Sequence, residues 1–217
     1  MNNKSKTYEK ELPSGYKQVF YLNAKDVKLG IILNLIALAI LSVTVAVAVL
    51  LLMARGKLAD LFVIAESPKK MADFIIAHFI FLISLLLYIV LHELVHGLAY
   101  KKLTGQKLTF GISWSCAFCG VPHIYTYRRT ALIAVAAPFL LFSILFIPLL
   151  ILLYFTDPYY FILASVVFGL HVGGCVGDLY VMYLLLFKFK DSGTLMRDTG
   201  PEQYFFVPCS DPTEDNL

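Results

Sequence analysis

The sequence contains few charged residues and little imbalance between the two signs of charge. Charged side chains make up 15% of the 217 residues, and 18 Lys and Arg against 15 Asp and Glu give a net charge of +3. This small excess does not indicate a nucleic-acid partner, for which clustered positive charge is expected. The chain also lacks low-complexity runs and internal repeats with a period of about 20 to 50 residues.

Apolar side chains, by contrast, are in excess. They make up 59% of the residues and give a mean hydropathy of +0.76, whereas about half is typical of a soluble domain. About 20 consecutive apolar residues cross the roughly 30 Å hydrocarbon core of a bilayer. Four stretches are long enough, at residues 29–53, 72–100, 130–155 and 159–187. We therefore expect an all-α membrane protein with four transmembrane helices and the lipid bilayer as a partner.

The Lys and Arg residues predict how these helices are oriented, because positive charge collects in cytoplasmic loops. With both termini inside, fourteen of these residues fall on the cytoplasmic side and four outside. The sequence thus predicts an N-in/C-in, multi-pass protein of the cell membrane. The first stretch is too long, and begins too far from the terminus, for a cleavable signal peptide, so we expect it to be retained as a helix.

The loops and ends divide the chain into three predicted regions. Residues 1–28 form a cytoplasmic arm, residues 29–187 the transmembrane domain and residues 188–217 a cytoplasmic tail. The loop "KLTFGISWSCAFCGVPHIYTYRR" is rich in β-branched and aromatic residues and contains Gly111, Gly120 and Pro122. This composition predicts a β-hairpin-like loop on the cytoplasmic side, between the second and third helices.

Cysteines are few, and on this topology they all lie on the reducing side of the membrane. The four are Cys116, Cys119, Cys175 and Cys209, and structural disulfides are not expected there. Cys116 and Cys119 form a C-x-x-C pair, but the other half of a zinc knuckle and a thioredoxin-like βαβ pattern are both absent. Reduced hairpin thiols are favoured, with a regulatory redox role as the alternative.

The apolar stretch "YIVLHELVHGLAY" carries an H-E-x-x-H motif made by His92, Glu93 and His96. On a helix, residues four apart lie on the same face, so both imidazoles can hold one zinc ion. Glu93 then lies beside the metal, where its carboxylate can take a proton from zinc-bound water. Ionisable residues are rare within membrane helices and mark functional sites there, which favours a metal centre over packed polar residues.

A zinc peptidase site needs a third protein ligand and leaves the fourth position for water. Only Glu93 and Asp178 among the fifteen acidic residues lie well inside predicted spans, so Asp178 is the leading candidate. With 1.5 Å of rise per residue, Asp178 lies about 13 Å from the inner end of its helix, and His92 and His96 about 12 and 6 Å from theirs. The three side chains therefore fall at comparable depths.

Two other features of the last predicted helix bear on this site. His171 lies seven residues before Asp178, on nearly the same face but about 10 Å higher. It is the second candidate for the third ligand, and an outer-shell or substrate-facing role is the alternative. Gly169, Gly173 and Gly177 recur every four residues and form a stripe along which a neighbouring helix can pack closely.

These motifs together resemble a known family. "HELVHG" near the end of a membrane helix, the loop ending in "YRRTALIAVAAP" and the later "GDL" resemble the zincin peptidases of small bacterial multi-pass membrane proteins. More distantly, the chain is similar to the site-2 protease class of intramembrane metalloproteases, which bind zinc through two histidines and an aspartate. The resemblance covers residues 80–187 and implies ligand roles for His92, His96 and Asp178 and the catalytic base for Glu93.

The sequence therefore predicts a zinc-dependent endopeptidase that binds one Zn²⁺ ion and cleaves membrane or membrane-proximal protein substrates near the cytoplasmic face. Two alternatives remain open. One is a non-catalytic scaffold, assembly or immunity factor with a structural metal site. The other is a metal or ion transporter, for which polar groups spread over the full membrane depth are expected. The sequence names neither a substrate nor an oligomeric state.

Overall fold

The structure is a computed structural model that describes residues 6–61, 68–112 and 117–209. It contains two compact units. We call them the sheet unit, formed by residues 1–30, 92–137 and 177–217, and the helical unit, formed by residues 31–91 and 138–176.

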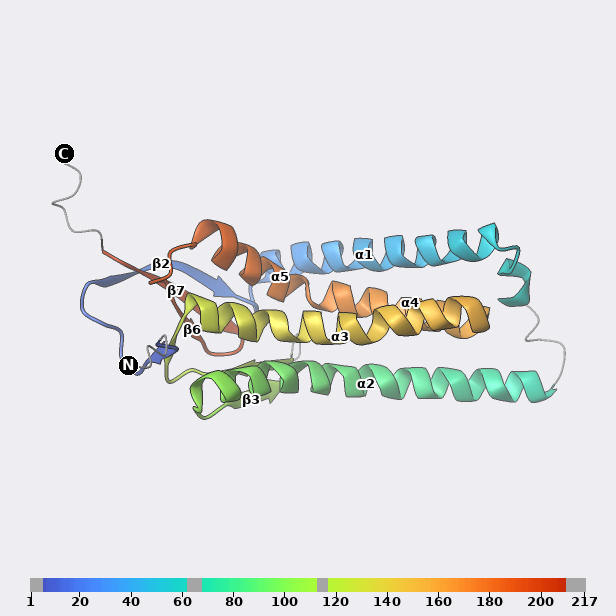
Figure 1. Cartoon of the computed structure of the whole chain (residues 1–217), viewed down its shortest axis with the longest axis horizontal. Coiled ribbons are helices and arrows are strands. Elements are labelled where there is room, and N and C mark those ends of the chain that lie inside the picture. Colours follow the sequence, from blue (N-terminus) through green and yellow to red (C-terminus); the bar gives the residue numbers. More distant parts are fainter. Residues whose placement is uncertain (1–5, 62–67, 113–116, 210–217) are drawn as a thin grey trace, which may run out of the picture. The chain divides into compact units, whose positions relative to one another are not determined.

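The chain is mostly helical, and its long helices fall where the apolar stretches predict them (Figure 1). Three helices are long and apolar enough to cross a membrane: α1 (Val27–Ala54), α2 (Pro68–Thr104) and α3 (Arg128–Thr156). Two shorter helices follow, α4 (Pro158–Gly174) and α5 (Val176–Tyr183). They make a fourth span if the pair is counted as one interrupted helix.

The last predicted helix is thus not continuous, because it is interrupted at Cys175. Two glycines, Gly173 and Gly174, come directly before the break, and each lowers helix stability by roughly 0.5–1 kcal/mol relative to Ala. The N–H of Cys175 still donates to the carbonyl of His171 at 3.0 Å, which closes the last turn of α4. Beyond α5 the chain continues as a π-helical segment (Leu184–Lys188).

The loop between α2 and α3 contains the predicted hairpin. Strand β3 (Thr109–Ile112) pairs antiparallel with β4 (Ala117–Gly120). The hairpin prediction is confirmed for these residues. Trp114 and Cys116 lie outside the residues that the structure describes.

A five-stranded antiparallel sheet is the part of the fold that the sequence did not predict. Its order is β1-β5-β6-β7-β2, and it joins both ends of the chain to the segment that follows the hairpin. The strands are β1 (Tyr8–Glu9), β2 (Tyr16–Asn23), β5 (Tyr125–Tyr127), β6 (Leu195–Asp198) and β7 (Glu202–Pro208). The prediction of an all-α protein is therefore incomplete, whereas the boundaries predicted for arm, membrane domain and tail stay a prediction.

The sheet is held to the helices of its own unit by an apolar core. Leu22 from β2 and Phe205 from β7 pack with Ala131 of α3 and with Leu184 and Leu185 of the π-helical segment. Leu185 and Phe205 are fully buried. This core fixes α5 and the start of α3 against the sheet.

The predicted glycine stripe of α4 is used within the helical unit, and its partner is α1. A Cβ atom at Gly169 would lie 2.9 Å from a methyl carbon of Leu41, and one at Gly173 would lie 3.0 Å from the backbone oxygen of Ala37. At Gly177, the third glycine of the stripe, nothing lies within 4 Å of such an atom. The first two glycines therefore serve helix packing.

This contact gives a stability prediction. Replacing Gly173 with Leu forces a side chain against the backbone of α1 and should destabilise the protein by about 1–3 kcal/mol, the usual cost of overpacking. Gly174→Leu is the matched control, because a Cβ atom there meets nothing within 4 Å. Thermal unfolding of the purified protein in detergent measures both. Equal melting temperatures for the two variants would contradict the close packing of α4 on α1.

Candidate metal centre

The structure brings the two histidines of the H-E-x-x-H motif together with Asp178. Nε2 of His92 lies 3.1 Å from Oδ2 of Asp178, and Nε2 of His96 lies 3.3 Å from Oδ1 of the same carboxylate. One ligand atom from each of the three residues lies within 4.8 Å of the other two. The histidine face of α2 and Asp178, which follows more than eighty positions later in the sequence, therefore meet within the sheet unit.

This spacing fits zinc. Zn–N and Zn–O bonds of about 2.0–2.2 Å in a tetrahedral site place neighbouring ligand atoms roughly 3.3–3.5 Å apart, and the three ligand atoms here lie within 4.8 Å of one another. The two nitrogens and one carboxylate oxygen are also a donor set that zinc accepts. The described residues supply three ligands and no fourth to this group. A three-ligand set is typical of catalytic sites, which keep one position open.

The backbone fixes the orientation of His96. Its Nδ1 lies 2.9 Å from the carbonyl oxygen of Ala134 in α3, and a carbonyl can only accept, so Nδ1 must carry the proton. In the neutral imidazole the lone pair is then on Nε2, the atom that faces Asp178. Metal-binding histidines usually have such a partner on the other ring nitrogen. Sequence reasoning missed Ala134, because a backbone acceptor leaves no mark in the sequence.

Asp178 reaches the site from the first turn of α5. A carboxylate is favoured there, because the free N–H groups at a helix N-terminus carry partial positive charge. Its side chain is 22% exposed, against 11% for His92 and 9% for His96. The cluster is thus enclosed on the histidine side and accessible beside the carboxylate.

Glu93 is half-buried next to the first histidine, and the hairpin lies beside it. The backbone of Cys119 in β4 lies close to its carboxylate. Gly97, just after His96, allows this approach, since a Cβ atom there would lie 2.7 Å from the Phe110 ring and 3.1 Å from Sγ of Cys119. The predicted base and the predicted hairpin therefore adjoin.

A buried hydrogen bond one turn beyond His96 ties α2 to the sheet. The hydroxyl of Tyr100 donates to Oδ2 of Asp198 in β6 at 2.8 Å, and the N–H of Gly200 donates to Oδ1 at 2.9 Å. Both side chains are buried, and burial raises the pKa of Asp198 to about 6. The sequence does not indicate this hydrogen bond, because the burial of Asp198 depends on strand pairing.

His171, the second candidate for the third ligand, is not a member of the three-residue group. It belongs to the helical unit and is fully buried there. Nδ1 lies 2.7 Å from the hydroxyl of Tyr88 and 3.7 Å from Sγ of Cys175, and Nε2 lies 3.2 Å from Oγ of Ser143. Its ring packs among Phe139, Phe142, Phe146 and Phe168. These contacts describe a hydrogen-bonded histidine in an aromatic environment.

Cys119 is a buried free thiol. Burial raises its pKa to about 12, and the nearby carboxylates of Asp198 and Glu93 add to the shift. A thiol in this environment stays protonated and unreactive, which agrees with the favoured prediction for the C-x-x-C pair. Cys116, its predicted neighbour in the pair, lies outside the described residues.

Comparison with known proteins bears directly on this centre. Residues 85–192 match the model of a family described as "Putative zincin peptidase". The chain belongs to this family. The match contains His92, Glu93, His96 and Asp178, confirms the resemblance predicted from the sequence and supports a metallopeptidase as the general class. No curated protein and no solved structure matches the chain significantly.

The raised pKa of Asp198 leads to a pH prediction. The unfolded carboxyl loses its proton near pH 4 and the folded one near pH 6, so between these values rising pH favours the unfolded state. The two pKa values imply that the free energy of unfolding falls by on the order of 3 kcal/mol, and that this fall is complete above about pH 6. Asp198→Asn keeps an acceptor for Gly200 and should remove this dependence.

Thermal unfolding of both proteins from pH 4 to pH 7 measures the effect. The melting temperature of the wild type should fall relative to that of Asp198→Asn as the pH rises towards 6, and the gap should then stay constant. A gap that does not change with pH would contradict a protonated, buried Asp198.

Proposed function

We propose that the protein is a zinc-dependent, membrane-embedded endopeptidase. The observation that carries the proposal is the meeting of His92 and His96 with Asp178, in a geometry that suits zinc and leaves a coordination position open. In this proposal these three residues hold the ion and Glu93 is the catalytic base. Membership of the zincin peptidase family supports the reaction class.

Zinc, when bound there, supplies a Lewis acid that lowers the pKa of water to about 7 and polarises a carbonyl group. Residues of the chain transfer the protons and orient the groups around the ion. Glu93 takes a proton from the attacking water and delivers it to the leaving amine. The carbonyl of Ala134 orients His96.

The proposal also includes the membrane arrangement. Four spans with both termini inside place fourteen Lys and Arg residues on the cytoplasmic side, and this arrangement puts the centre near the cytoplasmic face. The substrates are then peptide bonds of membrane or membrane-proximal proteins. The long apolar helices support a multi-pass membrane protein.

Zinc content tests the third ligand. We expect the detergent-purified wild type and His171→Ala to bind one zinc ion per chain, because His171 has partners of its own in the helical unit. Loss of an outer hydrogen bond lowers metal affinity about 10- to 100-fold. Asp178→Ala removes a ligand itself, so its zinc affinity should fall by more than that. Metal analysis after dialysis against a weak chelator measures this. Loss of zinc only in His171→Ala would overturn the assignment of Asp178.

Glu93→Gln tests the enzyme against the non-catalytic alternative. The amide cannot act as a base, so hydrolysis of a quenched-fluorescence peptide library should slow by about 10²- to 10⁴-fold. Zinc content and thermal stability should be those of the wild type, because Glu93 is not one of the three ligands. Equal rates in both proteins, with zinc present in both, would favour a scaffold or immunity factor with a structural metal site.

A further inference from the structure

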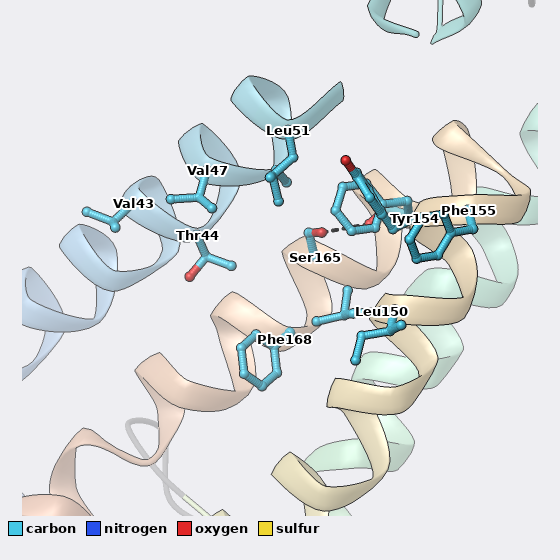
Figure 2. Close-up of a pocket in the computed structure, with 12 residues that line it drawn as sticks. Val43, Thr44, Val47, Leu51, Leu150, Tyr154, Phe155, Ser165 and Phe168 are labelled. Carbon is cyan, nitrogen blue, oxygen red and sulfur yellow. Dashed lines mark hydrogen bonds between the residues drawn. The ribbon is translucent and has the colours of Figure 1, made fainter. Parts of the chain in front are cut away.

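The helical unit contains an apolar groove of about 430 Å³ (Figure 2). Its walls come from α1, α3 and α4 and include Val43, Val47, Leu51, Leu150, Phe161 and Phe168. Two hydroxyls on the wall are already bonded within their own helices, since Thr44 donates to the carbonyl of Ile40 and Ser165 to that of Phe161. The groove therefore offers hydrocarbon contacts to a ligand.

The size of the groove distinguishes between apolar ligands. One turn of a helix about 10 Å wide and 5.4 Å long fills roughly 420 Å³, so the groove holds a single turn, whereas a membrane span has five or more. The volume instead lies within the range of about 300–1,000 Å³ that small-molecule sites occupy. A flexible alkyl chain fits such a space and a packed helix does not.

A cation lies at one end of the groove, where α1 and α3 end and α4 begins. The guanidinium carbon of Arg55 lies 4.7 Å from the ring centroid of Tyr154 and 5.5 Å from that of Phe155, and both aromatic residues line the groove. Arg55 also donates to the carbonyl of Tyr154. A helix of 28 residues is about 42 Å long, so its end lies at the level of the lipid headgroups rather than in the hydrocarbon core.

Arg55 has ring contacts and a backbone acceptor, but no carboxylate of the described residues neutralises its charge. The carbonyls at the end of α1 are satisfied by the N–H groups of Gly56 and Lys57, which donate to Met53 and Leu52. Lys57 pairs with Asp60 at 3.1 Å, but no described carboxylate lies within ion-pair distance of Arg55. A guanidinium has five N–H donors in a fork that matches a phosphate, and the hydrogen bond to the carbonyl of Tyr154 occupies one of them.

We infer that this groove binds one anionic phospholipid, with an acyl chain between α1, α3 and α4 and the phosphate on Arg55. The apolar wall supplies the affinity for the chain, and the cation at its end selects the headgroup. The inference needs only that the chain lies in a bilayer. It does not depend on the peptidase proposal.

Native mass spectrometry of the detergent-purified protein, with phosphatidylglycerol and phosphatidylcholine of equal chain length, tests the headgroup. The wild type should retain phosphatidylglycerol in preference. Arg55→Gln keeps a donor for Tyr154 but loses the charge, so the preference should fall about tenfold, as expected for a charge-assisted hydrogen bond. Arg55→Lys should retain part of the preference. Lys57→Gln should retain all of it, because the ammonium of Lys57 is already paired with Asp60 in the wild type.

A second pair of variants tests the groove itself. Val47→Trp places a ring in the groove and should reduce retention of both lipids. Leu50→Trp, on the same helix, is the matched control, because Leu50 is exposed and does not line the groove. Equal retention of the two lipids by the wild type, an unchanged preference in Arg55→Gln, or equal losses in the two Trp variants would overturn the inference.

Discussion

The carboxylate of Asp178, held between two imidazoles, is the interaction on which the metal centre of the sheet unit depends. An ionised carboxylate in an apolar region is costly unless it is paired or bound to a metal. The chain meets this requirement by bringing α5 to the face of α2 that carries His92 and His96. The hydrogen bond from His96 to Ala134 orients one of these imidazoles, and the packing of the π-helical segment against the sheet holds the end of α5, the helix that carries Asp178.

The sequence was informative where local chemistry decides the structure. Long apolar stretches mark α1, α2 and α3 to within four residues at each end, because twenty or more apolar residues have few other stable states. The motif in α2 and the scarcity of other acidic residues in the spans were enough to single out Asp178. The strand-like composition between Lys107 and Arg129 was enough to predict the hairpin.

The sequence was silent where long-range pairing decides the structure. Strands β2 and β7 lie near opposite ends of the chain, and neither shows which partner it takes. The burial of Asp198 beside Tyr100 depends on the pairing of β6 with β7, which the sequence of the tail does not indicate. The glycine stripe was recognised correctly as a packing surface, but only the structure shows that α1 packs against it.

The pairing of β2 with β7 also has a consequence for biosynthesis. Ribosomes deliver the chain from its N-terminus, so β2 emerges early and has no neighbour in its sheet until residues 202–208 have been made. β6, which carries the acceptor for Tyr100, is delivered only shortly before them. The surroundings of the metal centre are therefore complete only after residues 202–208 have been made, and a nascent chain that already holds its H-E-x-x-H helix still lacks the strands that fix it.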